Sequence, residues 1–278
     1  MADQCIAVAT DFSARADRAI DRALQISRSQ SRKLCVLHAL DVVEAENADW
    51  SALHRKMRSS VGTDEEKGAV EFVFPEGSPP KAIASACNER DAELLVIGPA
   101  RYNSLGDYFL GTSVDYVLRH TQLPLLVVKN RVRSPYDRIV AGTDFSPESA
   151  HAIIAAARLF PNAAVHVVHA WHVPFEGWNR DAYVADEMVE GEGGKMEKFL
   201  RRLAEREPRL SDATSELVRG GPIKAINAGL EKAPGALVVL GSHGNSGWRQ
   251  AAIGSVTSDL LRFVESDMLV VNTKDADA

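Results

Sequence analysis

Three glycines near the C-terminus have the spacing of an anion-binding loop. In "VVLGSHGNSGWRQAAIGS", Gly241 follows a short apolar run, Gly244 comes soon after it, and Gly254-Ser255 opens a helical pattern. Glycine after a strand lets the chain turn tightly and lets a ligand approach without meeting a Cβ atom. The first N–H groups of a helix lack partners within the helix and favour a negative charge. The loop is therefore predicted to hold phosphate groups between two sets of backbone donors.

The same loop lacks the parts of a phosphoryl-transfer enzyme. No lysine follows the glycine at the helix start, as in a Walker loop, and the glycines lie farther apart than in the dinucleotide fingerprint. Without that lysine or an evident arginine finger, fast phosphoryl transfer is not expected. A plainer alternative is that Gly241 makes a turn and Gly254 caps a helix. The strand–loop–helix setting and the facing Asp144 favour the binding site over this alternative.

Two other groups of side chains could do chemistry. His166, His169 and His172 are spaced three apart, but on a strand His169 points away from the other two, so a shared zinc ion would require a break in the strand. We expect structural histidines here, since His38 occupies the place of His169 in the first half of the chain. Ser255, His243 and Asp144 could form a hydrolytic triad, although the chain has no G-x-S-x-G elbow.

The elements that position these residues come from an internal repeat. The pairing places Asp11 opposite Asp144, and the matching segments are "IAVATDFSARADRAI" with "IVAGTDFSPESAHAI", "LCVLHALDV" with "VHVVHAWHV", "GSPPKAI" with "GGPIKAI", and residues 94–128 with residues 237–271. Self-similarity of this kind indicates two copies of one structural unit. We predict domains at residues 1–130 and 135–278, joined by the polar stretch "KNRVRSPYD".

The second copy is longer than the first. The extra residues fall between Ala170 and Gly220, and the segment 171–198 is rich in glycine and acidic residues at its centre. This composition is typical of an exposed excursion. We expect it to lie outside the core, where it could contact a protein partner.

Each copy alternates short β-rich runs with helical patterns. In the first copy the runs are Ile6–Ala9, Leu34–Leu37, Val70–Phe74, Leu94–Ile97 and Leu125–Val128. Near-continuous apolar strands separated by helices predict a parallel sheet covered on both faces. Ser13 and Ser146 are suitable helix N-caps, and Pro147 suits the first helical position. The predicted fold is α/β: two tandem, open, five-stranded, mostly parallel sheets with helices on both faces.

Composition narrows the class of protein. The 278-residue chain is 45% hydrophobic and 25% charged with net charge −6, which fits a globular protein and argues against nucleic acid or an anionic membrane as main partner. Cys5, Cys35 and Cys87 show no metal-type pairing and are expected to be reduced thiols, with Cys5 and Cys35 packed in the core. Because no signal peptide or apolar run of about 20 residues is evident, we expect a cytoplasmic protein.

Taken as a set, these motifs resemble the universal stress protein family. The resemblance rests on the G-x-x-G-x9-G-S loop, "TDFS" after the first strand, "LHA" or "VHA" after the second, and a closing "LLVV" strand, and it covers both copies. It implies a Rossmann-like fold of the adenine nucleotide alpha hydrolase type, ATP as ligand with or without Mg²⁺, and a regulatory role in stress response rather than a metabolic activity. It also implies pairing of units through the last strand, within one chain as a pseudo-dimer, with a homodimer of whole chains as a further expectation.

The resemblance assigns binding roles by position. In the second copy Asp144 is placed at the ribose, the backbone of Ala170 at adenine, and Leu240 with Gly241 beside the base and sugar; the residues placed around the phosphates are Gly244, Gly254, Ser255 and Val256. The equivalent first-copy positions are Asp11, Ala39, Gly98, Gly111, Thr112 and Ser113.

The first copy departs from the pattern at two positions. Arg101 stands where the second glycine should be, and Pro99 removes a backbone donor. We therefore expect the intact site in the second copy and a degenerate one in the first. The second copy departs at Asn245, where the family usually has a basic residue, which lowers the positive charge available to the phosphates.

Three functions remain open from the sequence. The leading hypothesis is ATP binding, chiefly in the second copy, with at most slow and incidental hydrolysis. The second is an interaction module whose nucleotide sites have both decayed. The third is a weak nucleotidase or hydrolase that uses Asp144 and His243.

Overall fold

The computed structural model describes residues 4–62, 69–99, 116–118, 121, 123–172, 182–242 and 253–272. The chain divides into two compact units, Met1–Pro135 and Tyr136–Ala278, where the sequence predicted residues 1–130 and 135–278. Gly244, His243, Asn245, Arg101, Gly111, Thr112 and Ser113 lie outside the described residues.

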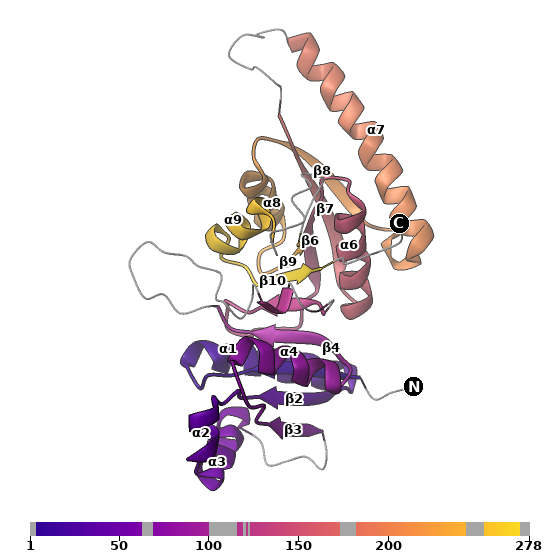
Figure 1. The fold of residues 1–278 in the computed structure, drawn as a ribbon. Helices are drawn as coiled ribbons and strands as arrows, with labels where there is room; N and C mark the ends of the chain where they lie inside the picture. The colour runs from indigo at the N-terminus through magenta and orange to yellow at the C-terminus, as the bar shows by residue number, and fades with distance from the viewer. Residues whose placement is uncertain are drawn as a thin grey trace. The chain divides into compact units, whose positions relative to one another are not determined.

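The first unit is a parallel sheet with helices on both faces (Figure 1). Its elements are β1 (Cys5–Ala9), α1 (Ala14–Gln30), β2 (Lys33–Leu37), α2 (Val42–Glu46), α3 (Trp50–Val61), β3 (Val70–Val73), α4 (Pro79–Glu89), β4 (Ala92–Ile97) and β5 (Leu125–Val127). The strand order is β3-β2-β1-β4-β5, and all four neighbouring pairs run parallel. All five predicted strands are found, and Ser13 caps α1 as predicted by accepting a hydrogen bond from Ala16 N at 3.3 Å.

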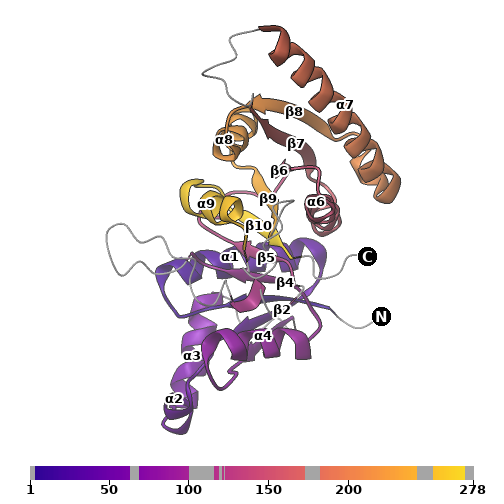
Figure 2. The ribbon, with the colours of Figure 1, turned by 45° about the horizontal axis from the view of Figure 1, so that its top comes forward.

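The second unit repeats this order of strands and helices. They are β6 (Arg138–Gly142), α6 (Pro147–Leu159), β7 (Ala164–Trp171), α7 (Ala182–Arg206), the 3₁₀ turn η1 (Pro208–Leu210), β8 (Thr214–Arg219), α8 (Pro222–Lys232), β9 (Leu237–Gly241), α9 (Ser255–Phe263) and β10 (Met268–Val271). The strand order β8-β7-β6-β9-β10 is again parallel throughout. Within this unit, α8 and α9 lie on one face of the sheet, and α6 and α7 lie on the other (Figures 1 and 2).

The described part of the insertion from Ala182 onward is helix α7, and among residues 188–198 only Met196 is buried, so the segment predicted to be exposed is a helix at the surface of the unit. Helix α7 runs beside α6, although it contains Gly191, Gly193 and Gly194, which have no neighbour where a Cβ would stand. Met196, Phe199 and Leu203 recur at helical spacing and are buried, so their packing against the unit offsets the low helix propensity of the glycines.

The cores of both units are built from the strands. The central residues of β1, β4, β6 and β9 are 0–1% exposed, as expected for central strands covered on both faces. Cys5 and Cys35 are 1% exposed, which confirms their predicted place in the core. No helix among the described residues is long and apolar enough to cross a membrane.

Gly229 lets α8 lie close to β6 and β7. A Cβ at this position would stand 2.7 Å from Val140 Cγ1 and 3.2 Å from Val168 Cγ1. We predict that Gly229→Ala destabilises the unit by about 1–3 kcal/mol, because overpacking a tight helix–sheet contact outweighs the gain in helix propensity. Thermal unfolding followed by circular dichroism measures this loss of stability. Gly191→Ala in α7, where the space is open, is the matched control and should be neutral or stabilising; a stabilising Gly229→Ala would contradict the close approach.

Candidate functional site

A cavity of about 180 Å³ opens at the carboxyl ends of the strands in the second unit. It lies where the strand order reverses, between β6 and β9, which is the switch point at which open α/β sheets bind ligands. Seven residues predicted from the sequence line this cavity, and they come from four separate segments: Asp144, Ala170, Leu240, Gly241, Gly254, Ser255 and Val256. The structure thus brings together every predicted second-copy residue that it describes.

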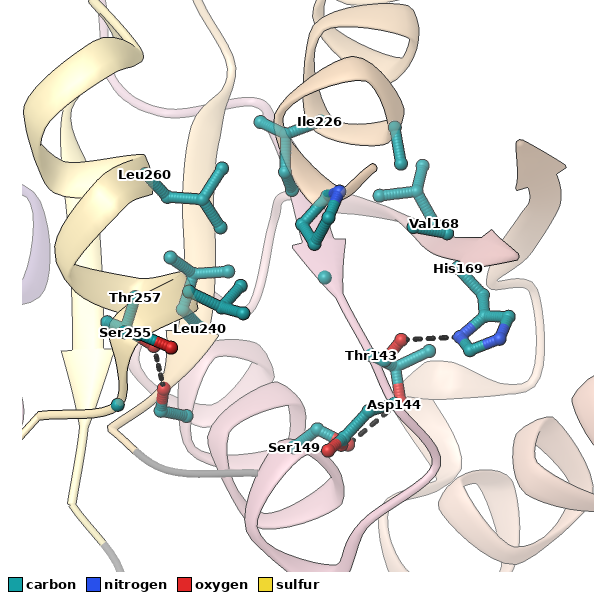
Figure 3. Close-up of a pocket in the computed structure, with 17 residues that line it drawn as sticks. Thr143, Asp144, Ser149, Val168, His169, Ile226, Leu240, Ser255, Thr257 and Leu260 are labelled. Carbon is teal, nitrogen blue, oxygen red and sulfur yellow. Dashed lines mark hydrogen bonds between the residues drawn. The ribbon is translucent and has the colours of Figure 1, made fainter. Parts of the chain in front are cut away.

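The walls of the cavity differ in polarity (Figure 3). Leu240, Ile226 and Leu260 gather on one side, while Thr143, Asp144 and Ser149 lie across from them. No lysine or arginine is among the described lining residues. The described part of the cavity therefore offers an apolar surface and a few polar groups, as small-molecule sites do.

The backbone of Ala170 faces the cavity because β7 extends beyond the end of β6. The last β6 pairing joins Gly142 to Val168, and the following Thr143 N donates to Val168 O at 3.0 Å. Backbone groups alternate in direction along a strand, so the N–H and C=O of Ala170 also point toward the β6 side, beyond the end of that strand. They have no partner among the described residues, which leaves one donor and one acceptor at the cavity wall.

The "TDFS" segment folds into a tight corner beneath the cavity. Phe145 N donates to Thr143 Oγ1 at 2.9 Å, and Ser146 N donates to Asp144 Oδ1 at 3.1 Å. Ser146 in turn caps α6 by accepting from Ser149 N at 3.1 Å, which confirms its predicted role. These bonds fix the direction of the Asp144 carboxylate at the edge of the cavity.

Phe145 has a left-handed backbone conformation, with φ of 63°. That conformation is costly for a bulky residue, and it is held by the two side-chain bonds of the corner and by ring packing. The Phe145 ring lies 4.2 Å from the His169 ring and 5.6 Å from the Phe199 ring. Sequence reasoning did not single out this phenylalanine, although its recurrence as Phe12 in the first copy was a visible signal.

His169 is a structural histidine, as predicted. Its Nδ1 lies 2.7 Å from the Thr143 carbonyl oxygen, so Nδ1 carries the proton and donates. Its Nε2 lies 3.5 Å from Glu192 of α7. His166 instead contacts Thr214 Oγ1, so the histidines serve different partners, and no cluster of metal-ligand type occurs in the described residues.

The N-terminus of α9 forms the remaining wall. Gly254 is the N-cap with φ of −64° and ψ of 154°, and no side chain caps this helix. The first helical hydrogen bond runs from Ser258 N to Gly254 O at 3.0 Å, so the N–H groups of Ser255 and Val256 precede it. Neither residue has a partner in the described part of the chain, and both are exposed. These donors and the helix dipole suit an anionic group.

The first unit keeps the same corner. Phe12 N donates to Thr10 Oγ1 at 3.0 Å, Ser13 N donates to Asp11 Oδ1 at 2.9 Å, and Thr10 O accepts from His38 Nδ1 at 2.8 Å. Asp11 follows β1 as Asp144 follows β6. Gly98 comes directly after β4, whereas Gly241 is the last residue of β9, and Ala39 follows β2.

The parallel sheet order places each unit in the class of doubly wound, Rossmann-like α/β domains, and in the second unit a pocket lies at the switch point. The model of the universal stress protein family matches residues 4–129 and 135–272. The chain therefore belongs to the universal stress protein family, in tandem form, as the sequence motifs indicated.

Relatives and solved structures agree with this membership. A putative universal stress protein from Staphylococcus saprophyticus is 23% identical over 140 residues, covering 45% of this chain and 82% of that protein. The crystal structure of a universal stress protein from Archaeoglobus fulgidus superposes with a TM-score of 0.64 at 16% identity, covering 98% of this chain and 99% of the other. The structure of a putative universal stress protein from Pseudomonas aeruginosa superposes with a TM-score of 0.65 at 20% identity. The match covers 98% of this chain and 93% of the other. At these identities the structural likeness concerns the fold.

Proposed function

We propose that the second unit binds ATP and that the chain acts as a nucleotide-binding regulatory protein rather than as a fast catalyst. The observation that carries this proposal is the convergence of seven sequence-predicted residues, from four segments, on one cavity. In this proposal the base, the ribose and the phosphates would lie in that order along the carboxyl edge of the sheet.

The base site is the wall that contains Ala170. Its unpartnered N–H and C=O match a ligand edge with one acceptor and one donor, and adenine offers such a pair in its ring nitrogens and its N6 amino group. The flat faces of the base would pack against Leu240 and Ile226, which line the same cavity. Burial of an aromatic ring against such side chains favours binding through the hydrophobic effect.

The ribose and phosphates would follow toward Asp144 and α9. Asp144 is oriented by its bonds to Ser146 and can accept a hydrogen bond from a ribose hydroxyl. The N–H groups of Ser255 and Val256, which have no partner among the described residues, would receive phosphate oxygens. We propose binding with little turnover, because the loop sequence has no Walker-type lysine to stabilise charge in the transition state.

The test compares Asp144→Ala with Asp11→Ala by isothermal titration with ATP and Mg²⁺. Asp144→Ala is expected to lower the affinity about tenfold to a hundredfold, the cost of a lost hydrogen bond to a charged group. Asp11→Ala removes the same local bond to a serine N–H in the first unit, and it should leave the affinity unchanged. Native mass spectrometry of the purified chain should find one nucleotide per chain.

Three outcomes would count against the proposal. A wild-type chain that takes up no ATP at millimolar concentration would favour the interaction module with decayed sites. Equal losses from both aspartate variants would place the nucleotide in both units. Steady release of phosphate, abolished by His243→Ala, would favour the hydrolase.

A further inference from the structure

One continuous segment of the first unit, residues 41–50, exposes apolar side chains. Val42 is 61% exposed, Val43 68% and Trp50 43%. Of the six large apolar side chains left exposed in the described residues, these three lie within this segment. Such a concentration on a surface is typical of an interaction site.

The segment is ordered without contributing to the core. Helix α2 has no buried residue, yet its start is fixed by a capping box, in which Glu44 N donates to Asp41 Oδ1 at 2.8 Å and Asp41 N donates to Glu44 Oε2 at 3.0 Å. Valine lowers helix propensity through its β-branch. Neither helix formation nor core packing therefore accounts for two adjacent exposed valines.

Trp50 begins α3 and is partly exposed. Its ring meets the Phe74 ring edge-on at 5.7 Å, while 43% of the residue stays accessible. A tryptophan that packs against a neighbouring ring and remains partly accessible can receive a partner side chain at a small cost in conformational entropy.

Every charged side chain within residues 41–50 is acidic, and the basic side chains of α3 begin only after residue 53. Asp41, Glu44, Glu46 and Asp49 are exposed, and none forms an ion pair with the described residues. No lysine, arginine or histidine occurs from residue 41 to residue 53. Nucleic acid and anionic lipid would be repelled by these carboxylates, whereas lysine and arginine side chains would be attracted.

We propose that residues 41–50 bind a basic, amphipathic segment of another protein, with its apolar side chains on Val42, Val43 and Trp50 and its basic side chains on the surrounding carboxylates. This surface shares no residue with the ATP pocket of the second unit. It also differs from the predicted contact over 171–198, much of which is helix α7.

The test uses three labelled peptides of equal length and helical pattern, built from Leu/Lys, Ser/Lys and Leu/Glu. Fluorescence anisotropy with the full chain at about 0.1 M salt is expected to show binding of the Leu/Lys peptide, at least tenfold tighter than either of the others. Val42→Ser with Val43→Ser should weaken it about tenfold or more. Glu44→Gln with Glu46→Gln should weaken it and flatten its salt dependence, while glutamine retains the capping box.

Matched controls lie elsewhere on the surface. Val189→Ser changes another exposed valine, and Glu231→Gln another exposed carboxylate, and neither should alter binding. The proposal is overturned if the wild-type chain does not bind the Leu/Lys peptide, if the segment variants bind it as the controls do, or if the Ser/Lys or Leu/Glu peptide binds equally well. Binding of anionic phospholipid vesicles that depends on Val42 and Val43 would overturn it in favour of a membrane.

Discussion

Replacing Ser255 by proline is expected to lower the affinity for ATP about a hundredfold or more, because two hydrogen bonds to a charged phosphate are lost together. The substitution removes the backbone N–H and the hydroxyl at the first position of α9. Both groups are donors that the proposed site turns toward the phosphates. Titration calorimetry with ATP and Mg²⁺ measures the loss.

The same substitution should leave the fold intact. Proline is well tolerated at the first helical position, where the N–H has no partner within the helix. The residue before a proline must be extended, and Gly254 already has φ of −64° and ψ of 154°. The melting temperature of Ser255→Pro should therefore stay within a degree or two of the wild type.

Ser255→Ala distinguishes the contribution of the hydroxyl from that of the backbone N–H. It removes the hydroxyl and keeps the N–H, so its affinity should lie between those of the wild type and Ser255→Pro. Unchanged binding of ATP by a folded Ser255→Pro variant would mean that the phosphates do not lie at α9. The nucleotide would then have to be placed elsewhere along the cavity.

The fold was predictable because the chain contains two copies of one unit, which can be compared with each other. A strand or a cap seen once in a sequence is ambiguous, but the two copies repeat the "TDFS" corner, the histidine near the end of the second strand and the glycine at the end of the fourth strand. His38 and His169 donate to the carbonyl oxygens of Thr10 and Thr143 at matching positions. Repetition of one residue type at one place in two copies thus distinguished a structural histidine from a metal ligand.

Two features of the site were not predictable by the same reasoning. The left-handed Phe145 contradicts the ordinary preference for glycine or asparagine at positive φ, because tertiary ring packing and the bonds of the corner override the local cost. The free backbone edge of Ala170 depends on β7 extending past β6, which is a matter of strand pairing between distant segments. Sequence periodicity describes one segment at a time and does not give that relation.

Helix α7 was not predicted from the sequence, because its three glycines favour a loop and its apolar residues form only a weak helical pattern. Gly191, Gly193 and Gly194 predict a loop by propensity, whereas the buried Phe199 and Leu203 form a stripe that only the packed unit makes effective. Propensity is a weak prior that tertiary contacts override. The insertion therefore contributes to the structure around the pocket through its buried residues.

Phe199→Ala is expected to destabilise the second unit by about 3–5 kcal/mol, the usual cost of truncating a buried phenylalanine. Phe199 is 6% exposed and packs against the Phe145 ring at 5.6 Å. Thermal or denaturant unfolding of the full chain measures the loss as an earlier transition of this unit. Val189→Ala on the same helix, where the side chain is 39% exposed, should change stability by less than about 0.5 kcal/mol.

The same variant also tests whether α7 supports the pocket. Phe199 holds Phe145, Phe145 packs against His169, and His169 donates to Thr143 beside the cavity. Loss of the first contact should loosen the corner that orients Asp144, so ATP affinity at a temperature where the variant is folded should fall as well. A destabilised variant that binds ATP as the wild type does would show that α7 only completes the core. A parallel loss of stability and affinity would instead mean that α7, which is longer than α3 at the same place in the first copy, helps to make the second copy the nucleotide-binding one.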